Sequence, residues 1–153
     1  MYLLIHEVGH VLFYLVVVFS VYLFFRNTGK VLLKPKYLLI GLLSTIFIDL
    51  DHFIDHFIYY GFSFNFLNFT SGTHFELSGK VFVFLHSWEL LCLLLFIGYY
   101  LIRKKNSYII FVIAVGMMTH VLYDTAYYGF SLEAYSLIYR LIMGFDIFVF
   151  RRY

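Results

Sequence analysis

The chain has 153 residues, of which 63% are hydrophobic, 24% aromatic and only 13% charged, and its mean hydropathy is +0.87. This composition excludes an ordinary soluble globular domain and is typical of a polytopic membrane protein. The formal net charge of +2 is too small to indicate a nucleic-acid partner. The single cysteine, Cys92, excludes an intramolecular disulfide and a cysteine-based zinc motif.

Apolar runs divide the chain into candidate membrane spans, each of which needs about 20 residues. In chain order, the runs are 2–25, 37–60, 81–102 and 108–128. A fifth run, 132–150, is weaker because it contains Glu133, Arg140 and Asp146; we expect it to span, with an interfacial amphipathic helix as the alternative. The sequence therefore predicts an all-α transmembrane helical bundle of four to five spans, which forms a single domain over residues 1–153.

Basic residues concentrate in two of the loops between these runs. They are Arg26, Lys30, Lys34 and Lys36 after the first run, and Arg103, Lys104 and Lys105 after the third. Short loops rich in Lys and Arg remain cytoplasmic, so we expect both loops on that side and the N-terminus outside. The first run lacks a basic leading segment and a small-residue cleavage site, so it is expected to be a retained helix. The connection 61–80 is then the long external loop.

With this orientation, the histidines and most acids fall at the external end of their runs. Ionisable residues at membrane depth are costly, by roughly 2.5–3.5 kcal/mol each on insertion scales, and indicate a functional site. Many are spaced to share one helix face. The pairs are His6 with His10, His52 with His56, His120 with Asp124, and His86 with Glu89. In the second run, Asp49, His52 and His56 lie on one stripe, with Asp51 and Asp55 on its flank.

Imidazole and carboxylate together are the ligand set of zinc, iron or manganese sites. The absence of cysteine from this set favours a catalytic or carboxylate-bridged site over a closed structural zinc site. More than four candidate ligands permit two ions, which suits phosphoester hydrolysis. The candidate metal ligands are His6, His10, Asp49, His52, His56, His86, His120 and Asp124. The candidate general bases, or groups that orient a ligand, are Glu7, Asp51 and Glu89.

Other interpretations of the same residues remain open. The stretch 6–10 spells H-E-x-x-H, in which two histidines bind zinc and Glu7 is the general base. An intramembrane metalloprotease would add a later aspartate as third ligand, although the Asn-Pro-Asp-Gly or Leu-Asp-Gly element of such proteases is missing. A metal or proton transporter would use the same groups as a relay, but no ionisable residue continues the path through the cytoplasmic half. A polar network that only holds the helices together is the remaining alternative.

Four short blocks occur in a characteristic order along the chain. They are Gly9-His10, "GLLSTIFIDLDH" ending at His52, "LHSWELL" around His86, and "THVLYD" ending at Asp124. In this order they resemble the family of LexA-binding, inner-membrane-associated metal-dependent hydrolases. The chain departs from the family pattern at Ile48, where the family has proline, and at Leu85, where it has threonine.

The resemblance implies a function, a location and a set of site residues. It implies metal or catalytic roles for His10, Asp49, Asp51, His52, His86, His120 and Asp124. It also implies a prokaryotic cytoplasmic (inner) membrane, with the active face on the non-cytoplasmic side. The late His-x-x-x-Asp is similar to that of zinc-dependent phospholipases C, which implies phosphoester chemistry. We therefore expect a divalent metal, zinc before iron or manganese, and a membrane lipid or lipid phosphoester as substrate.

Overall fold

The computed structural model describes residues 2–129 and 131–150, and the regular elements within them are all helical. In chain order they are α1 (Tyr2–Phe24), α2 (Arg26–Leu32), α3 (Pro35–Phe47), the 3₁₀ turn η1 (Ile48–Leu50), α4 (Asp51–Tyr60), α5 (Phe66–Thr70), α6 (Thr73–Ser78), α7 (Trp88–Lys105), α8 (Ile109–Tyr128), the 3₁₀ turn η2 (Leu132–Tyr135), α9 (Leu137–Ile142) and the 3₁₀ turn η3 (Ile147–Phe150). The predicted all-α fold is confirmed.

Three helical segments are long and apolar enough to cross a membrane. They are Ile5–Phe24 in α1, Pro35–Tyr60 from α3 through α4, and Ile109–Tyr128, which is α8. Their outward faces are apolar: on α1, for example, Leu12 is 58% exposed and Val16 is 60% exposed. Such a surface is unfavourable in water and favourable in lipid, so the chain has the character of a membrane protein.

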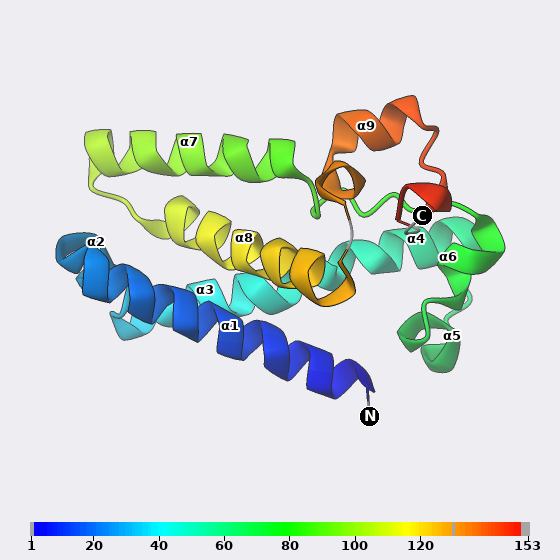
Figure 1. Ribbon diagram of the computed structural model, residues 1–153, viewed down its shortest axis with the longest axis horizontal. Helices are drawn as coiled ribbons and strands as arrows, with labels where there is room; N and C mark the ends of the chain where they lie inside the picture. The colour runs from blue at the N-terminus through cyan, green and yellow to red at the C-terminus, as the bar shows by residue number, and fades with distance from the viewer. Residues whose placement is uncertain (1, 130, 151–153) are drawn as a thin grey trace.

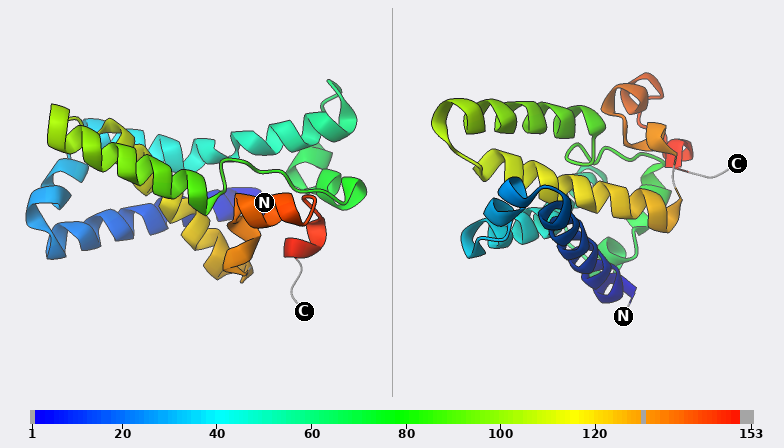
Figure 2. Two further views of the ribbon diagram at one scale, coloured as in Figure 1. Left: turned by 90° about the horizontal axis from the view of Figure 1, so that it is seen from above. Right: turned by 60° about the vertical axis from the view of Figure 1, so that its left-hand side comes forward.

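Helix α8 is the centre of the bundle and contacts α1, α3 and α7. Figure 2 shows α8 between α7 on one side and α1 and α3 on the other. Small residues allow the closest approach: the hydroxyl of Thr45 donates to the carbonyl of Gly116 at 3.1 Å and to that of Gly41 at 2.9 Å. A Cβ at Gly116 would collide with the carbonyl of Gly41 and the side chain of Ser44. Small residues at contacts of this kind are typical of helix packing in membranes.

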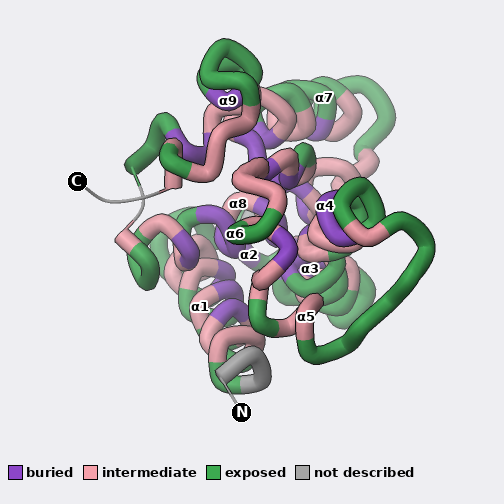
Figure 3. The backbone as a smooth tube through the Cα atoms, turned by 90° about the vertical axis from the view of Figure 1, so that its right-hand side faces the viewer, coloured by how far each residue is buried: buried purple, intermediate pink, exposed green. Residues whose placement is uncertain are grey.

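The long helices run along the same axis, so the molecule has two distinct ends (Figure 1). Helix α2 and the last turn of α7, which carry basic residues, lie at one end. The start of α1, α4, α6 and α9 lie at the other end. There, buried positions of α1, α4 and α8 face the centre of the bundle, whereas the connection around α5 is largely exposed (Figure 3). The candidate site residues belong to this second end.

Two expected helices differ in the structure. The run 132–150 is not one spanning helix: it consists of η2, the six-residue α9 and η3. The Ser136 side chain caps the start of α9 by accepting from the N–H of Tyr139, and Gly144 follows its end with a positive φ of 62°. At about 1.5 Å per residue, α9 is much shorter than the roughly 30 Å of a bilayer core. The run 81–102 is helical only from Trp88, because 81–87 is irregular.

The close contact at Gly116 gives a stability prediction. We expect Gly116→Leu to lower the free energy of unfolding by roughly 1–3 kcal/mol, because the added side chain forces α8 away from α3. Ala126→Leu is the control, since Ala126 lies on the exposed side of the same helix and should change little. Thermal unfolding in detergent, followed by circular dichroism, measures both. Equal unfolding midpoints for the two variants would contradict the packing described here.

Candidate metal centre

The first group of ligand atoms joins α1 to α8. The Nε2 atoms of His6 and His10 lie 2.9 Å apart, and they lie 3.1 and 3.2 Å from Oδ1 of Asp124. His10 is fully buried and His6 is partly exposed. The ligand atoms of a tetrahedral zinc ion with bonds of about 2.0 Å are about 3.3 Å apart. The three atoms are therefore spaced like three corners of a zinc site.

The second group surrounds Asp49 in η1. Oδ1 of Asp49 lies 3.2 Å from Nε2 of His52, 3.2 Å from Nε2 of His86 and 3.3 Å from Nε2 of His120. These residues come from α4, from the irregular segment before α7, and from α8. Ligand atoms of Asp49, His86 and His120 all lie within 4.8 Å of one another. This group is also compatible with a metal ion.

Asp124 and His120 connect the two groups. Oδ1 of Asp124 faces His6 and His10, whereas its Oδ2 lies 3.2 Å from Nε2 of His120. Nε2 of His120 in turn lies 3.3 Å from Asp49. One carboxylate thus presents its two oxygens to two neighbouring sets of ligand atoms. Asp124 could therefore contribute an oxygen to either set of ligand atoms.

Hydrogen bonds at Nδ1 orient two of the histidine rings. Nδ1 of His120 lies 2.7 Å from the carbonyl of Thr45, and Nδ1 of His86 lies 3.2 Å from Oδ2 of Asp51. An Nδ1–H that donates to these oxygens leaves Nε2 with its lone pair available, as in metal-bound histidines. Nε2 of His86 and Nε2 of His120 are buried and make no hydrogen bond within the described part of the chain. Because buried polar atoms are normally satisfied, these nitrogens fit metal ligands.

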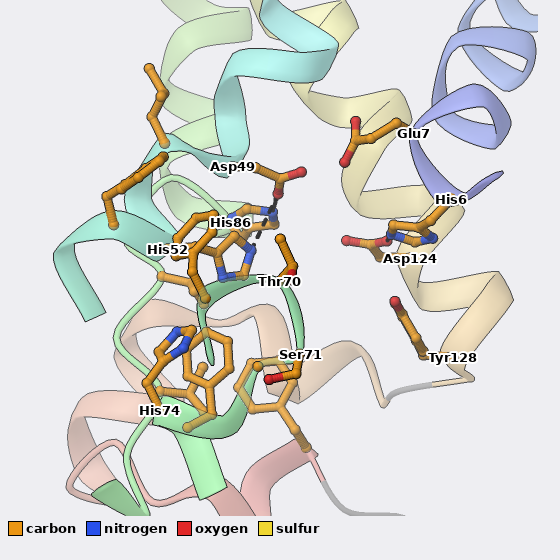
Figure 4. Close-up of a pocket in the computed structure, with 18 of the residues that line it drawn as sticks. His6, Glu7, Asp49, His52, Thr70, Ser71, His74, His86, Asp124 and Tyr128 are labelled. Carbon is orange, nitrogen blue, oxygen red and sulfur yellow. Dashed lines mark ion pairs between the residues drawn. The ribbon is translucent and has the colours of Figure 1, made fainter. Parts of the chain in front are cut away.

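The cluster opens into a cavity of about 820 Å³. Figure 4 shows the carboxylates of Glu7 and Asp49 close together at its edge, with His6 and Asp124 on one side and His52 and His86 on the other. The remaining walls are largely apolar. They include Ile46, Phe47, Leu50, Phe53, Phe69, Phe75, Val81, Val83, Ile147 and Phe150. Glu7 therefore reaches the same space as both groups of ligand atoms.

The connection 61–80 supplies further polar groups to the cavity wall. Thr70 at the end of α5, Ser71 directly after it and His74 of α6 line the cavity on the side away from Glu7 (Figure 4). His74 is 1% exposed, and this burial lowers its pKa to about 4. At neutral pH His74 is therefore uncharged. The sequence does not predict that these residues line the site, because Thr, Ser and His are common in loops.

The structure separates two predicted site residues from the cluster. His56 does not line the cavity; its ring packs against Tyr60 and Phe64, with ring centroids 4.8 and 5.3 Å away. Glu89 does not line the cavity either. Its carboxylate accepts from the Ser136 hydroxyl at 2.6 Å and from the N–H of Leu137 at 2.8 Å. The other predicted residues, apart from Asp51 behind His86 and the buried His10 and His120, line the cavity.

Two residues that sequence reasoning missed hold the segment that carries His86. Asp55 accepts from the backbone N–H groups of Phe82 and Val83. Arg140, which is fully buried, donates to carbonyls of the same segment. Helical spacing places Asp55 only on the flank of the metal stripe, and in the sequence Arg140 is only a charge that weakens the fifth run. The contacts connect residues that are far apart in the sequence, and no spacing pattern reveals them.

Comparisons with protein-family models, with curated proteins and with solved structures gave no match. The chemistry of the site is therefore inferred from its own geometry. That geometry supports a site for one or two metal ions, formed by buried histidines and aspartates.

The contact between Asp51 and His86 gives a prediction about metal affinity. We expect Asp51→Asn to weaken metal binding by about 10- to 100-fold, because the ring of His86 loses the carboxylate that orients it. Glu133→Gln is the control, since Glu133 is exposed and is not among the residues that line the cavity. Competition with a chromophoric chelator measures the affinity of each variant. Wild-type affinity in Asp51→Asn would show that this carboxylate does not support a ligand.

Proposed function

We propose that the protein is a membrane-embedded metal-dependent hydrolase whose centre holds two divalent ions. The observation that carries this proposal is the pair of ligand groups joined by Asp124, each with atoms spaced as around a metal ion. Nitrogen and oxygen ligands without cysteine suit zinc, and iron or manganese fit the same set. Divalent ions in such a site supply the acidification of a water molecule and the polarisation of a phosphoryl oxygen.

The residues of the chain have distinct roles in this proposal. His6, His10 and Asp124 hold one ion, and Asp49, His52, His86 and His120 hold the other. Glu7 faces the cavity beside both groups, so its carboxylate is placed to accept the proton of the attacking water. Asp51 orients His86. Glu89 contacts the start of α9 and is not proposed as a base.

A lipid-linked phosphoester is the substrate class that the cavity supports best. Phe47 and Leu50 line the cavity and are each 52% exposed. Both belong to Pro35–Tyr60, a segment suited to cross a membrane. The apolar wall of the cavity is thus continuous with the surface that faces lipid. An acyl chain can lie along this wall while the phosphoester reaches the ligand groups.

The proposed membrane topology has four spans. Helix α7 is added to the three apolar segments because it lies antiparallel to α8 along the same axis (Figure 1). The basic residues of α2 and of the end of α7 lie at the cytoplasmic side, so the N-terminus and the metal centre lie outside. Together with the family resemblance, this arrangement favours the prokaryotic cytoplasmic membrane, with the active face on its non-cytoplasmic side.

An intramembrane protease is the second candidate, and a specific observation favours it. His6 and His10 of the H-E-x-x-H stretch both contact Asp124, so this stretch has the third ligand that a one-ion protease requires. Glu7 would again be the base. The hydrolase requires the second group of ligands, around Asp49. The one-ion protease does not.

Metal analysis tests the proposed centre. We expect two ions per chain in the detergent-purified protein after reconstitution with zinc. We expect Asp124→Ala to bind one ion or none, because one oxygen of Asp124 faces His6 and the other faces His120. His56→Ala is the matched control: it removes a buried histidine that contacts neither group, four residues from His52. The absence of metal from the wild-type protein would leave a polar network that only holds the helices together.

A substrate comparison separates the two candidates. We expect His52→Ala to abolish phosphate release from phosphatidic acid in phosphatidylcholine vesicles, because the second ion loses a ligand. A protease built on His6, His10 and Asp124 would keep its activity in the same variant. Cleavage of a fluorescent transmembrane peptide provides the second assay. Peptide cleavage that persists in His52→Ala, without phosphate release by the wild-type protein, would establish the protease instead.

A further inference from the structure

The irregular segment 81–87 carries His86, although it has no helix of its own to fix that ligand. Carboxylates of α4 hold its N–H groups: Asp55 accepts from Phe82 at 2.7 Å and from Val83 at 3.0 Å. Asp51 accepts from the N–H of Leu85 at 2.7 Å. One side of this short segment is thus fixed to the helix that begins at the metal group.

Arg140 of α9 holds the carbonyl side of the same segment. Its guanidinium donates to the carbonyl of Phe82, to that of Val83 at 3.1 Å and to that of His86 at 3.1 Å. The planar guanidinium presents several donors in a fixed geometry, which suits simultaneous contacts with neighbouring carbonyls. Arg140 is 0% exposed, and a buried cation is tolerated only when it is well paired. One of the carbonyls that it holds belongs to the proposed ligand itself.

The rest of the C-terminal segment follows the same stretch of chain. The N–H of Val81 donates to the carbonyl of Phe145 at 2.9 Å, and the N–H of Ile147 donates to that of Gly79 at 2.9 Å. The side chain of Lys80 donates to the carbonyl of Gly144 at 2.7 Å. These contacts place residues 144–147 directly beside 79–81.

Glu89 fixes the start of α9 from the first turn of α7. Its carboxylate accepts from the Ser136 hydroxyl at 2.6 Å and from the N–H groups of Leu137 at 2.8 Å and Ile138 at 3.2 Å. The indole of Trp88 donates to the carbonyl of Leu132 at 2.8 Å. The residues that immediately follow His86 and Ser87 therefore anchor the helix that carries Arg140.

We propose that residues 132–150 form a clamp that positions His86, with Arg140 as the positioning residue and Glu89 as its anchor. This inference rests on the proposed metal centre and assigns a role to a segment that contributes no metal ligand. The hydrogen bonds of Arg140 reach the group around Asp49 through the carbonyl of His86. His6, His10 and Asp124 lie on α1 and α8, outside the hydrogen bonds described above for Arg140 and Glu89. We therefore expect loss of Arg140 to affect the ion group around Asp49 more than the other group.

The test is the metal content and spectrum of Arg140→Met, which keeps the length of the side chain and removes its donors. We expect one ion to bind as in the wild type and the other to bind about 10- to 100-fold more weakly, as for loss of a group that orients a ligand. In the cobalt-substituted protein, the visible bands of one ion should change and those of the other should remain. Arg103→Met is the control, because Arg103 lies at the opposite end of α7.

Two further variants separate positioning from general stability. Arg140→Lys keeps the charge but offers a single donor centre, so its second ion should bind with intermediate affinity. Glu89→Gln leaves the buried guanidinium in place and weakens only the anchor, so it should shift the same ion by a smaller factor. It also provides the test if Arg140→Met fails to fold.

The outcomes are distinct. Selective weakening of one ion supports the clamp. Wild-type binding of both ions in Arg140→Met and Glu89→Gln overturns it, and so does equal loss of both ions in Glu89→Gln. A wild-type protein that binds no metal overturns the proposed function itself, and the clamp as stated here falls with it.

Discussion

The structure depends on two carboxylates, the buried Asp124 and the partly exposed Asp49, that are surrounded by imidazoles from several segments. Asp124 and Asp49 each have three imidazole nitrogens within 3.3 Å. A carboxylate without partners in such surroundings is strongly unfavourable. The segments that supply these rings, α1, α4, α8 and the stretch before α7, must therefore meet at one place. The polar centre determines how this end of the bundle closes, while small residues determine the approach of α3 and α8 farther along.

The sequence predicts much of this centre, because helical spacing carries most of the information. His6 and His10 share a face of α1, and His120 and Asp124 share a face of α8. Their helical spacing, and their position at the same end of the apolar runs, predict that these four residues lie close together. The turn η1 favours the contact between Asp49 and His52, because residues three apart are nearly eclipsed in a 3₁₀ turn and their side chains point the same way. The same reasoning placed His56 on the stripe, but the regular α4 beyond the turn directs it towards Tyr60 and Phe64.

The parts that the sequence does not predict depend on contacts between distant residues. The apolar residues of 132–150 resemble those of a membrane span, yet they form a short helix because Ser136 and Gly144 bound it. In the sequence, Arg140 is a charged residue that interrupts an apolar run. Its role is recognised only from the structure, in which it donates to carbonyls of the segment 82–86. Glu89 shares a helical spacing with His86, but residues 81–87 are not helical, so its carboxylate is directed to α9.

The charge around the cavity relates the proposed ions to the proposed substrate. Glu7, Asp49, Glu76 and Asp124 are among the described residues that line the cavity, and none of the lining residues is Lys or Arg. His74 contributes no positive charge at neutral pH because its pKa is about 4. Asp49 and Asp124 already face imidazoles of His6, His52 and His86, which line the same cavity. In a hydrolase of the proposed kind, divalent ions held by these groups would add positive charge where an anionic phosphoester has no Lys or Arg among the described lining residues to pair with. The ions would thereby contribute to substrate recognition as well as to chemistry.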